Sequence, residues 1–325
     1  MSELQLPDNY LLKLIQQAKQ NYQFQELKRK RGKPPTYSAC SFWLLALAAI
    51  LLRAFSASEL HLLLTEDESL REVLGFEKVP HRKTIARRIS GLTDTGEQQI
   101  KALGLKILTA FAVADQQVSA IDGRMYQAIG PLWHKKHRQQ AVIPSKLRNV
   151  DTEAEWFKSG YRGWIQGYRL VMQALVFPEP VPLFALWRAN NEGESTIVKD
   201  ALTTEKLPVT EVMLADETFG GKELVSLYNK QGGYLLTPKQ FSARNKTWKN
   251  DLFEYRKETI ELLFQRVIQA TDIKECKVKG LGKNGAFVLA SVWLYQLVFW
   301  CNHQARKPLT ITKEQVDLAR WRVPI

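Results

Sequence analysis

The distribution of apolar and polar residues divides the chain into two kinds of region. The first third contains long apolar stretches with helical spacing, and from about residue 116 short apolar runs alternate with amphipathic segments. Two apolar runs, residues 39–52 and 286–301, are shorter than the roughly 18–20 residues that a membrane-spanning helix needs, and the second contains Gln296. We therefore expect both runs to form helices buried in the protein.

Residues 67–92 predict two helices joined by a turn that contains Gly75 and Pro80. Ile85 and Ile89 are four residues apart, so they would lie on one side of the second helix. The basic residues of that helix are Arg82, Lys83, Arg87 and Arg88. An apolar stripe with a basic opposite face suits a helix that docks on DNA, and the alternative is an ordinary solvated face.

Five short runs after residue 116 have the composition of β-strands. They are residues 118–122, 167–177, 181–189, 210–216 and 233–238. Helical stretches intervene near residues 194–206 and 220–231, and the chain after residue 250 is again helical in pattern. Three strands in series followed by alternating helices and strands predict a mixed sheet flanked by helices.

The charge of the chain favours a polyanionic partner. The 325 residues include 46 lysines and arginines against 33 aspartates and glutamates, a formal net charge of +13. This excess favours nucleic acid over a membrane surface, although charge can also serve solubility alone. Three widely spaced cysteines without a CxxC pair indicate reduced thiols in a cytoplasm, and the first residues show no signal-peptide pattern.

Two of the predicted strands lead into an aspartate. Val118, Ala120 and Ile121 precede Asp122, and the apolar run 212–215 precedes Asp216. A carboxylate at the end of a buried strand either caps a turn or is paired with a cation, because isolated buried charge is costly. If the strands are neighbours, their carboxylates converge and favour a divalent ion with hard oxygen ligands, Mg²⁺ or Mn²⁺.

A glutamate in the last helical region is a third candidate ligand. Glu261 lies beside an apolar helical stripe that includes Ile260, Phe264 and Val267. By itself it would be read as an ordinary exposed helix residue.

Several stretches, in this order, resemble the DDE transposases of bacterial insertion sequences. AIDGRMYQA resembles the strand with the first aspartate, MLADETFGGKEL the strand with the second, and RKETIELLF the signature around the glutamate. RNVDTEAEWFKSGYRGWIQGYRL and KGLGKNGAFVLASVWLYQLVFWCN resemble the approach to the second strand and the closing helix, and KRGKPPTYS and PHRKTIARRI fit the N-terminal region. The resemblance covers residues from about 30 to 305.

The resemblance implies an α/β fold, an RNase H-like mixed sheet flanked by helices with an all-helical N-terminal region. Asp122, Asp216 and Glu261 would be the catalytic and metal-binding triad, with two Mg²⁺ (or Mn²⁺) ions per active site. The implied domains are a helical DNA-binding and dimerisation region (1–115), the catalytic domain (116–305) and a tail (306–325).

The implied activity is binding of element ends, DNA cleavage at these ends and joining of the 3′ ends to target DNA. The expected partners are the terminal inverted repeats and the target DNA, with a homodimer on DNA, no membrane, and a cytoplasmic, nucleoid-associated location in a bacterium. The predicted DNA-binding residues are Arg82, Lys83, Arg87, Arg88, Lys135, Lys136, Tyr255, Arg256 and Lys257, together with the basic run 28–31.

The chain departs from the family pattern at several positions, and among them Tyr255 is not in the expected register. Arg124 stands where a small hydroxyl residue is common, and Lys257 where arginine is preferred. The lysine usual further along the glutamate helix has no clear match, and Arg266 or Lys274 are the available substitutes. Two other functions are possible for a chain with this resemblance, a DDE nuclease without strand transfer and a domesticated DNA-binding descendant. The intact acidic residues disfavour the domesticated descendant.

Overall fold

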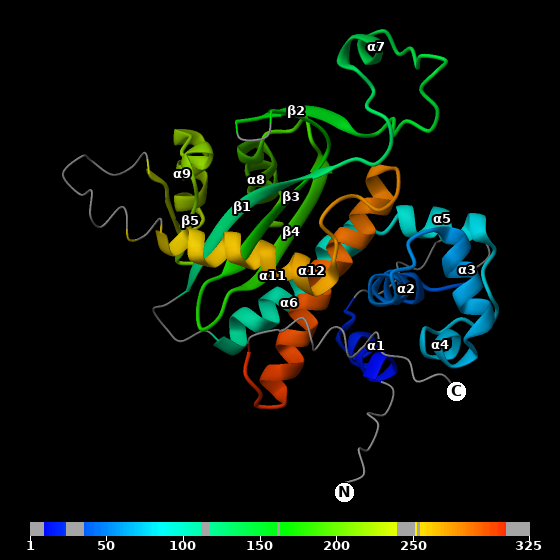
Figure 1. Cartoon of the computed structure of the whole chain (residues 1–325). Helices are drawn as coiled ribbons and strands as arrows, with labels where there is room; N and C mark the ends of the chain where they lie inside the picture. Colours follow the sequence, from blue (N-terminus) through cyan, green and yellow to red (C-terminus); the bar gives the residue numbers. More distant parts are fainter. Residues whose placement is uncertain are drawn as a thin grey trace, which may run out of the picture.

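The computed structural model describes residues 10–23, 36–111, 117–160, 163–238, 251 and 254–309. It shows a mixed sheet flanked by helices, with a helical N-terminal region beside it (Figure 1). The expected fold class is confirmed, and the arrangement is consistent with an RNase H-like fold.

Six helices form the described part of the N-terminal region. They are α1 (Tyr10–Asn21), α2 (Ala39–Leu52), α3 (Ala57–Glu66), α4 (Glu68–Val73), α5 (Arg82–Ser90) and α6 (Thr93–Phe111). Ser56 and Glu59 form a capping box at the start of α3, which satisfies backbone N–H groups that the first turn leaves free. Gly75 adopts φ +80° in the turn after α4, a conformation that favours glycine. The predicted pair of helices over residues 67–92 is therefore present.

The sheet contains six strands among the described residues. They are β1 (Val118–Gln127), β2 (Glu155–Ser159), β3 (Gly163–Leu175), β4 (Val181–Ala189), β5 (Val212–Leu214) and β6 (Tyr234–Leu236). β3 lies antiparallel to β1, β2 and β4, whereas β5 lies parallel to both β1 and β6. β2 has no counterpart among the predicted strands, because its short and partly exposed sequence lacks an apolar alternation.

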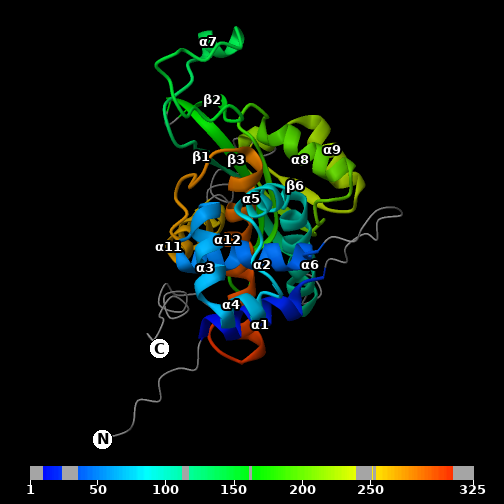
Figure 2. The same ribbon diagram turned by 90° about the vertical axis from the view of Figure 1, so that its right-hand side faces the viewer.

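Helices cover both faces of the sheet, as the two perpendicular views show (Figures 1 and 2). The smaller core lies under α8 (Glu194–Thr203) and α9 (Lys222–Lys230), and Ile121 of β1 points into it. The larger core lies under α6, α11 (Leu262–Thr271) and α12 (Leu281–Gln304), and Ala120 of β1 points into it. Successive residues of β1 therefore face opposite helical layers. The remaining described helical segments are α7 (Lys135–Gln139), a 3-10 turn η1 (Glu217–Phe219) and a π-helical segment η4 (Lys257–Glu261).

The N-terminal helices share the larger core with the sheet and its C-terminal helices. The rings of Trp43 in α2 and Trp293 in α12 lie 5.7 Å apart between centroids. The Gln296 side-chain nitrogen donates to the backbone oxygens of Ile100 and Pro182, which joins three elements in the interior. The predicted domain boundary between residues 115 and 116 lies in a stretch outside the described residues.

One helix of the described chain, α12, has the length and apolar character that would allow it to cross a membrane. In this protein 94% of its apolar window is buried inside the fold. α2 and α3 pass the same test only as a pair, and they are bent by 95° at their junction. The two apolar runs expected to be buried helices therefore lie in the core, within α2 and α12.

Candidate active site

Asp122 and Asp216 lie where two adjacent parallel strands separate. β1 pairs with β5 only as far as Ala120 and Leu214, so each aspartate lies two residues beyond the last pair. The expectation that the first strand ends at Asp122 is wrong, because β1 continues along β3 as far as Gln127. The loss of β5 as a partner, rather than the end of the strand, opens the sheet at this point.

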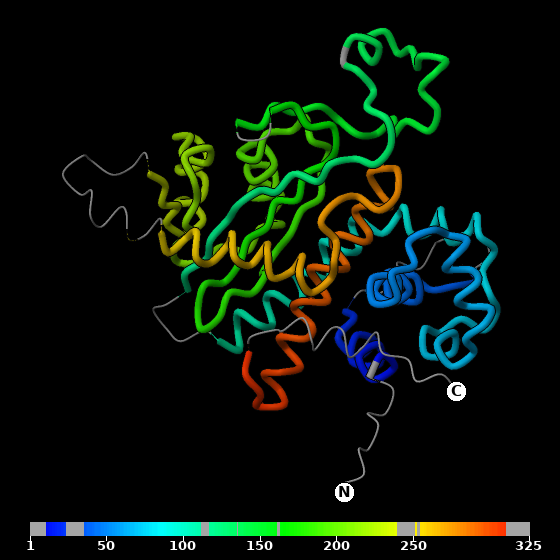
Figure 3. The backbone as a smooth tube through the Cα atoms, in the orientation of Figure 1, coloured from blue at the N-terminus to red at the C-terminus, as the bar shows by residue number. Residues whose placement is uncertain are grey.

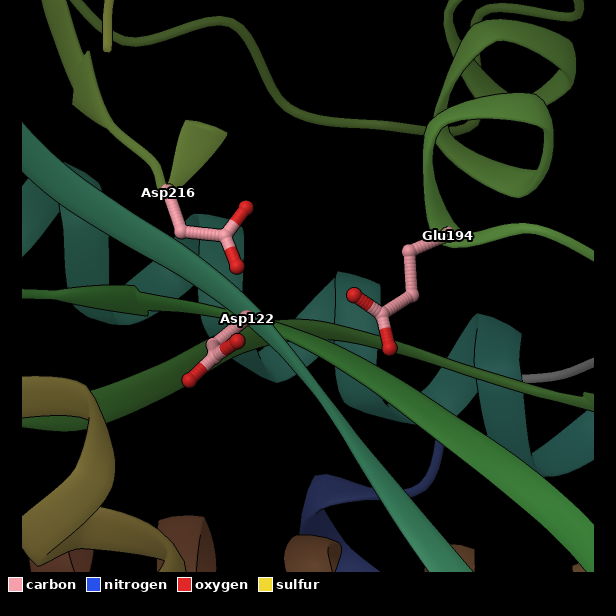
Figure 4. Close-up of side chains that lie close together, drawn as sticks. All are labelled: Asp122, Glu194 and Asp216. Carbon is pink, nitrogen blue, oxygen red and sulfur yellow. The ribbon is translucent and has the colours of Figure 1, made fainter. Parts of the chain in front are cut away.

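A third carboxylate, that of Glu194, completes the cluster. One carboxylate oxygen from each of Asp122, Glu194 and Asp216 lies within 4.8 Å of the other two. Figure 4 shows the three side chains turned toward one another from β1, the start of α8 and the segment after β5. We call these three residues the acid cluster.

Local backbone features place each member of the acid cluster. Gly123 has no side chain, and a Cβ there would overlap the Glu194 carboxylate. Asp216 accepts a hydrogen bond of 2.8 Å from the backbone N–H of Thr218 and so caps η1. The sequence analysis gave two explanations for an aspartate at the end of a strand, turn capping or pairing with a cation. Asp216 caps a turn and also belongs to the acid cluster.

Glu194 was missed in the sequence analysis. It is the first residue of α8, and the predicted helix near residues 194–206 began at this position. Acidic residues are common in the first turn of a helix because they interact favourably with its dipole, so this position alone is not specific for a metal ligand.

Two members of the acid cluster, Asp122 and Glu194, hold protons more tightly than isolated carboxyl groups. Burial raises the pKa of Asp122 to about 6, against the opposing effect of Arg256, and Asp216 and Glu261 add to the increase. Burial raises the pKa of Glu194 to about 7, against Arg169, and Asp122 and Asp216 add to it. A divalent cation among these oxygens would favour their ionised forms, so the donor set fits a metal.

Two buried arginines lie on either side of the acid cluster. Arg169 Nε lies 3.5 Å from Glu194 Oε1, and Arg169 Nη1 donates a 2.6 Å hydrogen bond to the backbone oxygen of Glu192. The Arg169 guanidinium also stacks over the Phe157 ring at 4.1 Å. On the other side, Arg256 Nη1 lies 3.4 Å from Asp122 Oδ2. These cations offset part of the negative charge that the cluster concentrates.

Glu261 lies beside the acid cluster but is separated from it by Arg256. Arg256 Nη2 lies 3.4 Å from Glu261 Oε1, so one guanidinium bridges Glu261 and Asp122. The Glu261 side chain is 49% exposed. Glu261 is the last residue of η4, and such π-helical segments are frequent at functional sites. The structure thus brings the two predicted aspartates together with Glu194, and the catalytic role predicted for Glu261 stays a prediction.

The helix α5 presents its predicted basic face to solvent. Ile85 and Ile89 are buried, as predicted. Arg88 is half-buried, donates a 3.0 Å hydrogen bond to the Tyr37 backbone oxygen and lies over the Phe42 ring at 5.0 Å. The exposed basic residues of α5 are Arg82, Lys83 and Arg87, which we call the α5 basic face. Arg88 therefore serves packing in this structure, while the other three are accessible.

The remaining predicted DNA-binding residues differ in environment. Lys136 is exposed on α7, in a loop that projects from the body of the molecule (Figure 3). Tyr255 is half-buried with its ring 5.4 Å from that of Phe177, and Lys257 forms an exposed 2.9 Å ion pair with Glu254. Arg256, in contrast, is buried against the acids. The Lys135 side chain and the basic run 28–31 lie outside the described part of the chain.

Comparison with known proteins yields distant structural likenesses. No protein-family model matches the chain, and no curated protein matches it. A piggyBac transposase synaptic complex with hairpin DNA is similar over 97% of this chain and 77% of that chain, with 7% identity and a TM-score of 0.42. A Mos1 transposase paired-end complex is similar over 85% and 82%, with 12% identity and a TM-score of 0.23. At these values the likeness assigns no family, and the functional conclusion depends on the geometry of the site.

Proposed function

We propose that this protein is a DDE transposase that binds the ends of a mobile element, cleaves DNA at those ends and joins the 3′ ends to target DNA. The observation that carries the proposal is the convergence of Asp122, Glu194 and Asp216 where β1 and β5 separate. The net charge of +13 and the accessible α5 basic face supply the attraction for a polyanionic substrate.

The acid cluster would hold the divalent metal, Mg²⁺ or Mn²⁺, with two ions per active site. Hard carboxylate oxygens suit these ions, and three convergent carboxylates supply several of the ligands they need. When bound, such ions make a water or 3′-hydroxyl a better nucleophile and stabilise the leaving oxygen of the phosphodiester. Glu261, half-exposed and next to Arg256, would complete the site if the guanidinium moved aside.

The other residues of the site have supporting roles in this proposal. Gly123 leaves room for the Glu194 carboxylate, and Arg169 orients it by contact from the sheet. The α5 basic face and Lys136 of the projecting loop would contact the phosphate backbone of double-stranded DNA.

Two further parts of the proposal concern assembly and location. One acid cluster serves one strand at a time, so joining two ends requires at least a dimer on DNA. Repulsion between two chains of charge +13 opposes dimerisation until DNA neutralises it. Mass photometry with and without end DNA should therefore show dimers only with DNA, and a strictly monomeric complex that joins two ends would contradict this.

We place the protein in the bacterial cytoplasm with the nucleoid.

The central experiment is cleavage and strand transfer in vitro, with candidate ends taken from the DNA that flanks the gene. With Mg²⁺ or Mn²⁺, the wild-type protein should release and join these ends, and Asp122→Asn, Glu194→Gln and Asp216→Asn should abolish both products while end binding in a gel shift persists. Glu217→Gln is the matched control, because this exposed acid is the neighbour of Asp216.

The outcomes separate the alternatives. Full cleavage by Asp216→Asn would contradict the proposal. Cleavage without joined products would indicate a DDE nuclease, and end binding without cleavage under any metal would indicate a domesticated DNA-binding protein. Glu261→Gln, compared with its exposed neighbour Glu258→Gln, tests whether the glutamate that the family resemblance implies also takes part.

A further inference from the structure

A cavity of about 440 Å³ lies beside α11, close to the strand that carries Asp122. Figure 1 shows α11 crossing the sheet, with α2 further along the same side. The cavity is lined by Arg53, Arg124, Gln265, Ile268, Gln269, Asp272 and Lys274. We propose that this cavity binds a backbone phosphate of the DNA strand that leaves the acid cluster. The inference rests on the proposed function and adds a specific phosphate contact to it.

The lining has the chemistry of a phosphate site. Arg53, Arg124 and Lys274 contribute three positive charges, and Asp272 is the only acid among the described lining residues. Asp272 pairs with Arg53 at 3.2 Å, but both side chains are more than half exposed, so this ion pair is weak. Arg53 can therefore exchange its partner for a phosphate oxygen at little cost. A cavity with one aliphatic side chain and several N–H donors favours an anion over an apolar ligand.

Arg124 gives independent evidence of a missing acceptor. Its Nε is buried and has no hydrogen-bond partner among the described residues. Its guanidinium lies 5.8 Å from the centroid of the Tyr126 ring, which packs against one side of the group. A buried guanidinium N–H without an acceptor is destabilising, so an anion at this position would satisfy it.

The register of β1 relates the cavity to the acid cluster. Arg124 follows Asp122 by two residues on an extended strand, so the two side chains emerge on the same face about 7 Å apart. Neighbouring phosphates of one DNA strand are about this far apart, because the backbone winds around the helix axis while it rises about 3.4 Å per nucleotide, so the spacing corresponds to one nucleotide. A strand with its reacting phosphate at Asp122 would thus bring another phosphate to Arg124. The arginine that departs from the family pattern at this position acquires a role as a phosphate ligand.

The first test is the salt dependence of DNA binding by two single variants, Arg124→Gln and Lys274→Gln, on a short duplex. Each lost phosphate contact should flatten the slope of log affinity against log salt by about one unit. Lys230→Gln is the matched control, since this exposed lysine ends α9 on the opposite side of the sheet and its loss should leave the slope unchanged. Lys274 is exposed, so its variant should fold normally even if Arg124→Gln does not. Slopes for both cavity variants equal to that of Lys230→Gln would overturn the proposal.

The second test locates the contact. A neutral methylphosphonate at the phosphate next to the cleaved bond should weaken binding by the wild-type protein but add nothing to the defect of Arg124→Gln. A methylphosphonate effect that is equally large in the variant would place the contact elsewhere and overturn the proposal. A parallel experiment measures whether inorganic phosphate alone stabilises the wild-type protein. Stabilisation of the wild-type protein by phosphate, together with an unchanged DNA slope in Arg124→Gln, would mean that the cavity takes a free anion instead of DNA.

These readouts are independent of catalysis. The phosphate site would be refuted if the cavity variants and Lys230→Gln had the same salt slope while Asp216→Asn still abolished cleavage. The proposed function would then stand. Active Asp216→Asn protein would refute the proposed function whatever the slope.

Discussion

Replacement of Glu194 by glutamine should stabilise the metal-free protein at alkaline pH. The side chain keeps its shape and loses its charge, and its amide oxygen can still face Arg169 Nε, which lies 3.5 Å from Glu194 Oε1. The reason is that the folded protein forces Glu194 and Asp122 to ionise in a buried site, which raises both pKa values. A carboxyl group whose pKa is raised by folding binds more protons in the folded than in the unfolded state, so its contribution falls as the pH rises.

The magnitude follows from the pKa of about 7 for Glu194, against 4.5 for an unperturbed glutamate. With about 1.4 kcal/mol per pKa unit, ionisation of Glu194 costs the folded state about 3 kcal/mol. The cost is absent below about pH 4 and reaches its full value once the pH has passed the folded pKa near 7. Glutamine removes it, so the free energy of unfolding should rise by at most about 3 kcal/mol at about pH 8 and change little at about pH 4.

Urea unfolding followed by circular dichroism, with a chelator and then with Mn²⁺, measures this difference. Without metal, Glu194→Gln should be the more stable protein at the alkaline pH, whereas the control Glu217→Gln should match the wild type. With Mn²⁺ the order should reverse, because an ion that binds only the folded state stabilises it by mass action and the variant has lost a ligand. Lower stability of Glu194→Gln without metal, or equal stabilisation of both proteins by Mn²⁺, would refute the reasoning.

Three further predictions follow from the packing and charge of the molecule. Gly123→Ala should displace the flexible Glu194 side chain, so Mn²⁺ affinity measured by calorimetry should fall at least about tenfold with little change in thermal stability, and unchanged affinity would contradict the geometry. Gly104→Ala should lower the free energy of unfolding in urea by about 1–3 kcal/mol or more, because the new Cβ meets the rigid backbone carbonyl of Leu183. Gly160→Ala places its Cβ in open space and is the control, and equal destabilisation by the two substitutions would argue against this contact. Replacement of the α5 basic face by alanines should flatten the salt dependence of DNA binding by about three units in a fluorescence titration, and an unchanged slope would place DNA recognition on other surfaces.

The sequence by itself determined most of the elements. Alternating and continuous apolar runs report the local period of the backbone, and these patterns located β4 at residues 181–189 and the buried face of α5 through Ile85 and Ile89. They also indicated two strands that each lead into an aspartate, and the parallel pairing of β1 with β5 brings Asp122 and Asp216 to one place. An apolar period of two or of 3.6 residues depends only on residues close in sequence, so it can be recognised before the tertiary structure is known.

Only the tertiary structure decided how these elements combine into a site. Glu194 joins the acid cluster because α8 packs against the sheet and Gly123 leaves room for its carboxylate. The residues around Glu194 in the sequence predict neither contact. The extension of β1 beyond Asp122 depends on its pairing with β3, a strand distant in sequence. The position of Arg256 between Asp122 and Glu261 depends likewise on how η4 lies over β1. Strand register and the approach of distant side chains are set by long-range packing, which local periodicity does not encode.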